Sequence, residues 1–369
     1  MFYLALVLIF ALLGVISYYM SVRMHKGLLA FFPKCKFRPV LAFFMTLTFL
    51  FILGFARVGF SICAYCMGIY IYLLFYTVIS HLVTSILHLT KFPFVRHPRY
   101  AGFAMMSVVL CTIVTCIWGF INVQRVHHVS YDIQIQSQTD ISGLNIVMFS
   151  DLHLGSVGSE DRLDKIVDEI NHLEPDILCI AGDFFDTEFS SIQNPEKAIQ
   201  TLRKIRTTYG VYACLGNHDA GKTFPQMTDF IEKANIQLLN DEAVVIDERL
   251  VLVGRVDGSP IGGYGTLQRK DFTQILTPEM KNLPVVVLDH NPANINEYGE
   301  DADLILCGHT HKGQLFPANL ITKVMYTVDY GYYQKDAKSP QVIVSSGVGY
   351  WGMPMRVGTQ CEIVSIRIG

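Results

Sequence analysis

The sequence predicts an N-terminal four-helix transmembrane region followed by an α/β domain, and three observations lead to this fold class. Of the 369 residues, 51% are hydrophobic and 17% are charged, a balance that a purely soluble domain rarely shows. Long uncharged stretches fill the first third of the chain, whereas the charged residues collect after Arg125. In that second part, short runs rich in Val, Ile and Leu alternate with stretches of helical spacing. We therefore expect a membrane domain at 1–124 and a second domain at 125–369.

Four hydrophobic runs in the first domain are long enough to cross a membrane. A helix rises about 1.5 Å per residue, so about 20 apolar residues span the roughly 30 Å hydrocarbon core. We expect transmembrane helices at about 2–22, 40–56, 62–86 and 102–124. The third run, from Val58 to Leu89, is longer than one span needs, so its ends stay open. A cleaved signal peptide is the alternative for the first run, but no basic residue precedes it and three further runs follow.

The basic residues of the loops predict the orientation of the spans. Two loops are basic, with Arg23, Lys26, Lys34, Lys36 and Arg38 between spans one and two, and Lys91, Arg96 and Arg99 between spans three and four. The connection between spans two and three offers Arg57 alone. Because short basic loops face the cytoplasm, we expect a multi-pass cell-membrane protein whose second domain is extracytoplasmic.

Net charge and cysteine usage argue against a nucleic-acid-binding protein and against a disulfide-stabilised fold. The formal net charge is −3, and no Lys/Arg cluster stands out after Arg125, so we expect no nucleic-acid partner. Cys63 and Cys66 form a C-x-x-C, but within an apolar helix two small residues three apart are more often packing than redox chemistry. The cysteines of the second domain each lie in an apolar run, and we expect no disulfide framework.

Five short apolar runs in the second domain are typical of buried strands. They are Leu144 to Phe149, Ile177 to Ala181, Val211 to Leu215, Val285 to Leu288 and Leu304 to Cys307. The first three alternate with amphipathic stretches, which predicts an α/β sheet. The segments from Ala243 to Gly254 and from Gln341 to Ile368 predict further strands without long helices between them, and hence a second sheet.

Each of the five runs ends in polar residues that could bind a metal. The endings are Asp151-Leu152-His153, Gly182-Asp183, Gly216-Asn217-His218-Asp219, Asp289-His290 and Gly308-His309-Thr310-His311. A single Asp-x-His would be explained by a capping Asp and a surface His, but five such endings in order leave that explanation little room. The carboxyl ends of strands form the ligand crevice of an open α/β sheet, so these side chains can converge. The pattern predicts a metal site.

The types of ligand indicate which metals and which chemistry to expect. Imidazole, carboxylate and amide donors without a thiolate favour Mn, Fe or Zn over Mg or Ca. Two divalent ions roughly 3.5 to 4 Å apart can hold a bridging hydroxide and clamp the phosphoryl oxygens of an in-line displacement. Asp151, Asp183 and the hydroxide would remove three of the four positive charges, so the site would still attract an anionic phosphate.

The five endings resemble the motifs of the calcineurin-like metallophosphoesterase superfamily, which are matched in full from Asn145 onward. The resemblance implies a two-sheet α-β-β-α sandwich. Residues 308–314 (GHTHKGQ), 344–349 (VSSGVG) and 354–356 (PMR) look like the bacterial membrane-associated phosphodiesterase branch, or transmembrane proteins with a metallophosphoesterase domain. At 359–362 the chain has TQCE where relatives tend to have Pro-Pro-Glu, a departure that bears on substrate choice more than on catalysis.

The resemblance also implies a role for each site residue. It places Asp151, His153 and His311 on one metal, Asn217, His290 and His309 on the other, and Asp183 between them. It implies that His218 is not a ligand but lies beside the substrate, as an acid or a phosphate contact. Asp186 and Asp219 would lie behind the ligands, with Asp219 a candidate to hold the His218 ring. Resemblance to bacterial relatives makes manganese the first choice of metal.

Two further groups of residues have both a functional and an ordinary interpretation. Arg356 and Lys312 are either phosphate or headgroup contacts or solvated surface charges. An aromatic and methionine cluster follows the last His motif, at Phe316, Tyr326, Tyr330, Tyr332, Tyr333, Trp351, Met353 and Met355. The cluster is either ordinary sheet packing or an apolar rim that faces the bilayer and admits an acyl chain.

These expectations favour hydrolysis of a phosphodiester or pyrophosphate bond in a lipid or lipid-linked substrate at the membrane surface, with membrane lipids and a phosphoester as partners. One alternative is a phosphomonoesterase that acts on a soluble metabolite. The other is a non-catalytic, metal-bound membrane sensor, although such a module would have no need for His218. The natural substrate, the oligomeric state and any role of the helices beyond anchoring stay open.

Overall fold

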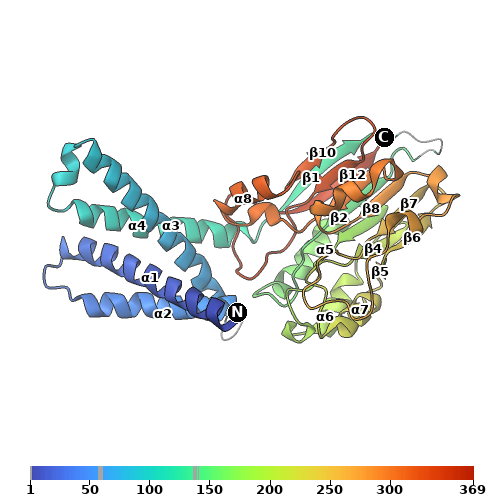
Figure 1. Ribbon diagram of the computed structural model, residues 1–369. Helices are drawn as coiled ribbons and strands as arrows, with labels where there is room; N and C mark the ends of the chain where they lie inside the picture. Colours follow the sequence, from blue (N-terminus) through green and yellow to red (C-terminus); the bar gives the residue numbers. More distant parts are fainter. Residues whose placement is uncertain (1, 57–60, 136–138, 140) are drawn as a thin grey trace. The chain divides into compact units, whose positions relative to one another are not determined.

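The computed structural model describes residues 2–56, 61–135, 139 and 141–369. Arg57 and the beginning of the third hydrophobic run, 58–60, lie outside the described residues. The chain divides into two compact units, Met1–Phe120 and Ile121–Gly369 (Figure 1). We call them the membrane unit and the second unit and describe each by itself.

The four predicted apolar helices are confirmed. They are α1 (Phe2–Leu29), α2 (Phe37–Phe55), α3 (Ile62–Leu89) and α4 (Tyr100–Asn122), with a 3₁₀ turn η1 (Pro93–Arg96) before the last. Each is long and apolar enough to cross a membrane. The helix α1 extends beyond the predicted end at residue 22, because Arg23 and Lys26 are good helix formers that can continue a helix past its apolar stretch.

Buried serine and threonine hydroxyl groups of the membrane unit donate to the backbone of their own helix. Ser21 donates to the carbonyl oxygen of Ser17 at 2.6 Å, and Thr77 donates to that of Leu73 at 2.6 Å, both four residues back along the helix. In hydrocarbon an unpaired polar group costs several kcal/mol, so this pattern lets small polar residues lie among apolar ones. The same unit has an apolar core around Met20, Phe44, Tyr70 and Leu73.

The second unit contains a first sheet of six strands in the order β1-β12-β2-β3-β4-β5. The strands are β1 (Val126–Ile133), β12 (Cys361–Ile368), β2 (Asn145–Phe149), β3 (Ile177–Ala181), β4 (Gly210–Cys214) and β5 (Gln237–Leu238). From β2 to β5 all neighbours are parallel, whereas β12 runs antiparallel to β2. The chain therefore enters this sheet at one edge with β1 and returns beside it at the end.

The predicted second sheet is also present, with six strands in the order β10-β11-β9-β8-β7-β6. The strands are β10 (Gly331–Tyr333), β11 (Gln341–Val344), β9 (Leu304–Cys307), β8 (Val285–Leu288), β7 (Leu250–Gly254) and β6 (Glu242–Ile246). The four central strands are parallel, and the two edge strands are antiparallel to their neighbours. Both sheets are therefore mixed.

The two sheets pack face to face. Ile146 and Cys179 from the first sheet share a buried cluster with Leu252, Val286 and Leu306 from the second. The strands are apolar on both faces, which agrees with their continuous hydrophobic runs. Packing of the two inner faces brings corresponding ends of the two sets of parallel strands close together.

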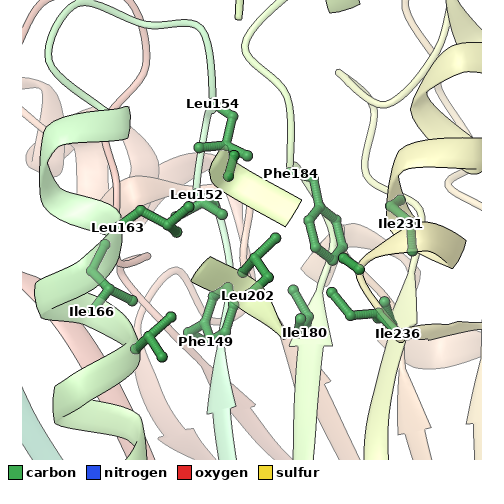
Figure 2. Close-up of a cluster of buried hydrophobic side chains, with 14 of the residues drawn as sticks. Phe149, Leu152, Leu154, Leu163, Ile166, Ile180, Phe184, Leu202, Ile231 and Ile236 are labelled. Carbon is green, nitrogen blue, oxygen red and sulfur yellow. The ribbon is translucent and has the colours of Figure 1, made fainter. Parts of the chain in front are cut away.

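Different elements cover the two outer faces. The first sheet is covered by α5 (Leu163–His172), α6 (Pro195–Leu202) and α7 (Phe224–Lys233), whose apolar sides pack on Phe149, Ile180 and Phe184 (Figure 2). The second sheet is covered by short 3₁₀ turns, including η4 (Phe272–Gln274) and η6 (Pro292–Glu297). One α-helix, α8 (Ala318–Met325), has no buried residue.

Candidate metal centre

The predicted ligand turns follow five parallel strands. Asp151 follows β2, Asp183 follows β3, Asn217 follows β4, His290 follows β8 and His309 follows β9. Since parallel strands share an edge at their carboxyl ends, each sheet presents its turns at one place, and the face-to-face packing brings the two places together. The structure thus gathers all seven predicted ligands into one cluster.

The segment after β2 shows how local packing directs ligands into the cluster. Leu152 and Leu154 are buried with Leu163 in the helix-covered core (Figure 2), whereas Asp151 and His153 contact other predicted ligands. Asp151 and His153 have positive φ angles of 55° and 50°. A left-handed backbone costs a non-glycine residue on the order of 1–3 kcal/mol, and such strain persists where the surrounding structure holds it, commonly at functional sites.

The same backbone conformation recurs in the other turns. Asp183, His309 and His311 have φ angles of 54°, 71° and 50°. Two of the glycines in these turns are required by close approach: a Cβ at Gly308 would lie 2.5 Å from Asp151 Oδ2, and one at Gly216 would clash with the Asp183 side chain. The tight turns therefore allow neighbouring strand ends to come within ligand distance.

One group of donor atoms consists of Asp151, His153 and His311. His311 Nε2 lies 3.1 Å from His153 Nε2 and 3.3 Å from Asp151 Oδ1, and all three residues are buried. Atoms at such mutual distances can ligate a single ion. This is the set that the motif resemblance implies for one metal.

A second group consists of Asn217, His290 and His309. His309 Nδ1 lies 2.8 Å from Asn217 Oδ1 and 3.3 Å from His290 Nε2. Asp183 Oδ2 lies 3.2 Å from His290 Nε2 in this group and 3.7 Å from His153 Nε2 in the first. A single carboxylate oxygen therefore faces both groups, which is the place of a bridging ligand.

The imidazoles of this cluster are arranged as metal ligands require. His290 Nδ1 contacts the carbonyl oxygen of Ala181 at 2.8 Å, which directs Nε2 into the cluster. Burial, and then His290, lower the pKa of His309 to about 4, while burial and Arg356 hold the pKa of His311 well below its usual value. His309 and His311 are therefore neutral at pH 7, the form in which imidazole binds a metal. At His290 burial is outweighed by Asp183, which raises the pKa of that ring, so His290 must release a proton when a metal binds. The donor set fits two divalent ions.

Arg356 lies behind His311 and is completely buried. Its guanidinium donates to the carbonyl oxygens of His311 at 3.0 Å, Ser346 at 2.7 Å and Gly349 at 2.6 Å, and Nη2 lies 3.0 Å from His311 Nδ1. The interpretation of Arg356 as a solvated surface charge is therefore wrong. Because these donors are directed at backbone carbonyl oxygens, Arg356 holds the backbone that carries the predicted ligand His311 and does not face a phosphate.

Sequence comparisons agree with this geometry. A family model described as "Calcineurin-like phosphoesterase" matches residues 144–313. An "Uncharacterized metallophosphoesterase" of Aquifex aeolicus is 33% identical over 239 residues, which cover 64% of this chain and 90% of that protein. The chain belongs to the calcineurin-like phosphoesterase family. The resemblance and fold class inferred from the motifs are thereby confirmed, and we call the second unit the phosphoesterase unit.

Two other relatives have more informative names. A "Transmembrane protein with metallophosphoesterase domain" of Danio rerio is 28% identical over 320 residues, covering 82% of this chain and 71% of that protein. The "UDP-2,3-diacylglucosamine pyrophosphatase LpxG" of Chlamydia trachomatis is 23% identical over 310 residues, covering 67% and 91%. With three other curated relatives, this chain matches about 60% of the relative's length. The Danio rerio match exceeds the phosphoesterase unit alone, which together with the four apolar helices supports membrane association.

The phosphoesterase unit holds His218 in a way that the motifs do not predict. His218 Nδ1 lies 2.7 Å from the backbone oxygen of Asp186, whose carboxylate lies 3.3 Å from His153 Nδ1. The prediction that Asp219 holds the His218 ring is wrong. The buried Asp219 carboxylate instead accepts from the backbone N–H groups of Phe185 and Gly216, at 3.0 and 2.9 Å, and thereby fixes two turns of the site.

Lys312 is directed away from the ligands. Its ammonium group lies 3.7 Å from the centre of the Tyr330 ring, a cation–π contact. The residue is half-buried and has a positive φ of 49°. A phosphate contact by Lys312 has no support in this arrangement.

A cavity of about 380 Å³ lies beside the phosphoesterase ligands. Its polar lining includes Asp183, Asn217, His218, His309 and His311, and its apolar lining includes Leu315, Ala318, Ile321, Trp351 and Met353. Of the aromatic and methionine cluster, Trp351 and Met353 therefore lie at the site, whereas Met355 is buried and Tyr332 packs at the exposed edge strand β10. Sequence reasoning missed α8, although its spacing of apolar residues at 318–325 is helical.

Proposed function

We propose that this phosphoesterase hydrolyses a phosphodiester or pyrophosphate bond in a lipid or lipid-linked substrate at the membrane surface. The observation that carries the proposal is the single cavity that joins the predicted metal ligands to an apolar wall. A substrate with a phosphoryl group and an acyl chain would match both parts of the lining.

The polar part of the cavity would bind the phosphoryl group. Two divalent ions, when bound, would supply electrostatic stabilisation and an activated water, with manganese our first choice and iron or zinc the alternatives. The chain would hold the ions with six ligands in two groups and the shared carboxylate of Asp183. Asp183, Asn217, His309 and His311 lie at both the ligand cluster and the cavity, so a phosphoryl group in the cavity would be next to the ions.

His218 is the residue that we propose for proton transfer to the leaving oxygen. Since Nδ1 donates its hydrogen to the backbone oxygen of Asp186, Nε2 is the atom that faces the substrate. Burial lowers the pKa of His218, so the free ring is neutral with a lone pair on Nε2, and it can protonate the leaving oxygen only after Nε2 has taken up a proton, a form that a bound phosphoryl anion favours. The ring lines the cavity beside Asp183 and stands at 79° to the ring of His153, with 5.1 Å between ring centres. A positioned imidazole of this kind contributes about 10²–10⁴-fold to the rate.

The apolar part of the cavity would take an acyl chain. Ile321 of α8 lines the cavity and is 60% exposed, and its helix neighbours Leu320, Val324 and Met325 are also exposed. Large apolar side chains gathered at a site mark contact with lipid or another apolar partner. The chlamydial relative is named for a diacylated substrate, and four apolar helices would keep this enzyme at the bilayer.

The reaction class can be tested on the full-length protein in detergent. We expect Mn-loaded protein to cleave bis(4-nitrophenyl) phosphate faster than 4-nitrophenyl phosphate, and His218→Ala to lose about 10²–10⁴-fold in kcat with its metal content unchanged. Faster cleavage of the monoester would mean that the protein is a phosphomonoesterase and not a phosphodiesterase. Absence of turnover at full metal occupancy would favour the metal-bound sensor.

The substrate class needs a separate comparison. Two diesters with the same headgroup are compared, one with long acyl chains and one with short, water-soluble chains. At equal concentration in mixed micelles, we expect the long-chain diester to be hydrolysed faster. Equal rates would remove the lipid from the proposal while leaving the phosphoesterase chemistry intact.

The side of the membrane on which the reaction takes place is also a proposal. The basic loops around α1–α2 and α3–α4 favour an extracytoplasmic phosphoesterase unit. An antibody against a C-terminal epitope tag should label intact cells. Labelling that requires permeabilised cells would reverse the orientation.

A further inference from the structure

The membrane unit contains a second cavity, of about 310 Å³, formed by α1, α3, α4 and the connection between the last two. It lies where α1 and α3 end and α4 begins, which is the end of the bundle that carries the basic loops. Its polar lining includes Arg23, Lys26, Ser80, Thr84, His88 and His97. The cavity is therefore built from three helices and has basic and hydroxyl groups in its wall.

The charge of this lining cannot be neutralised by side chains of the membrane unit. Residues 1–120 contain neither Asp nor Glu. Arg23 is nevertheless half-buried in the bundle, next to the more exposed Lys26. A charged group that is partly removed from water at a membrane needs an opposite charge or a polar partner, so an external anion would stabilise this arrangement.

The rest of the lining is apolar. Met24, Val95 and Val108 are each less than 10% exposed, and all three line the cavity together with Met105. A free inorganic anion would gain nothing from such a surface. A molecule with an anionic head and hydrocarbon chains would place its head near Arg23 and Lys26 and its chains along the apolar lining.

We propose that this cavity binds the phosphate-bearing headgroup of an anionic membrane phospholipid. The ligand is bound and not hydrolysed there, because the predicted metal ligands all belong to the other unit. The site is independent of the proposed reaction, and it gives the helices a role in lipid recognition beyond anchoring.

The test measures lipid binding by the full-length protein in EDTA, so that metal-dependent hydrolysis cannot consume the probe. Dioleoyl phosphatidylglycerol, dioleoyl phosphatidylcholine and inorganic phosphate are each titrated, and retained molecules are counted by native mass spectrometry. The test variant is Arg23→Gln/Lys26→Gln. The matched control is Lys34→Gln/Lys36→Gln, which removes the same charge from exposed positions between α1 and α2 that do not line the cavity.

We expect phosphatidylglycerol to bind the native chain, and the Arg23/Lys26 variant to bind it roughly thirtyfold more weakly, since each lost cationic contact is worth about fivefold at a membrane surface. The control variant should lose less than about fivefold. Lys26→Gln alone should lose about fivefold, which keeps the proposal testable if the double variant does not fold by circular dichroism.

Three results would overturn the proposal. Equal losses in the test and control variants would show that general surface charge, not the cavity, attracts the lipid. Equal affinity for phosphatidylcholine would exclude recognition of an anionic headgroup. Binding of inorganic phosphate as tightly as phosphatidylglycerol would exclude a lipid as the specific ligand.

Discussion

In the membrane unit the basic side chains lie near helix ends and in loops, whereas in the phosphoesterase unit several charged side chains are completely buried. Arg255, Arg356 and Asp219 are at most 1% exposed, yet each meets polar partners within the fold. Among the described residues of the membrane unit, the buried polar side chains are those of serine and threonine, and hydroxyls such as that of Thr77 bond to their own helix. The difference teaches that a charge is buried here only where tertiary contacts supply its partners.

The two units also differ in where their exposed hydrophobic side chains lie. Among the described residues, large exposed hydrophobic side chains are spread over all four helices of the membrane unit. In the phosphoesterase unit they gather at 316–325, with Phe316, Leu320, Ile321, Val324 and Met325, and are otherwise scattered. The α8 region is therefore the part of the catalytic surface that most resembles a lipid-facing helix.

The largest expected effect is at the carboxylate shared by the two ligand groups. Asp183→Asn should lower kcat on bis(4-nitrophenyl) phosphate by on the order of 10³-fold or more, because metal ions contribute several kcal/mol of transition-state stabilisation. Metal content by plasma mass spectrometry should fall in parallel. If the variant kept its activity, the buried charge of Asp183 would have no metal-binding role, and the comparison of the two units would lose its main example.

The second prediction compares apolar side chains in the two units. Ile146→Ala, between the two sheets, should destabilise the phosphoesterase unit by about 2–5 kcal/mol through loss of contacts and a cavity. Leu110→Ala, on the exposed surface of α4, should change stability by no more than about 0.5 kcal/mol, since lipid can replace the lost contacts. Denaturant unfolding in a mild detergent measures both. Equal effects would show that the exposed surface of α4 is covered by protein.

The third prediction concerns the buried arginines. Arg356→Met should weaken metal binding by about 10–100-fold, because the backbone that carries His311 loses the group that holds it in place. The matched variant Arg255→Met removes another fully buried guanidinium, one that pairs with Asp241 at 3.3 Å instead of a predicted ligand. It should lower stability but leave metal affinity nearly unchanged. Titration with Mn²⁺ of variants that remain folded separates the two, and equal losses of affinity would deny Arg356 a specific role.

The smallest effect is expected at α8. Ile321→Ser/Val324→Ser should reduce turnover of a long-chain lipid diester by about tenfold, equivalent to about 1.4 kcal/mol of lost apolar contact, and leave a short-chain analogue unaffected. Val245→Ser, which alters an exposed apolar residue on the edge strand β6, is the control. A loss on both substrates would assign α8 to the stability of the site rather than to lipid contact.

Local patterns in the sequence were enough to predict much of this molecule. Four uncharged stretches predicted the helices, because helix length and apolar composition are properties of one continuous segment. Runs of β-branched residues that end in Asp, Asn or His predicted both the strands and the candidate ligands. The parallel pairing of β1 with β12 was not predicted, because it joins segments from opposite ends of the unit.

The sequence by itself determined which residues stand at the strand ends, and hence the donor set of the candidate metal centre. Only the tertiary structure decided what surrounds them: the backbone oxygen of Asp186 at His218, the guanidinium of Arg356 at His311, and α8 beside the cavity. Asp219 shows the reason, since its neighbour in the sequence is His218 but its hydrogen-bond donors come from Gly216 and Phe185. Side-chain partners depend on where distant turns meet, which no local pattern records.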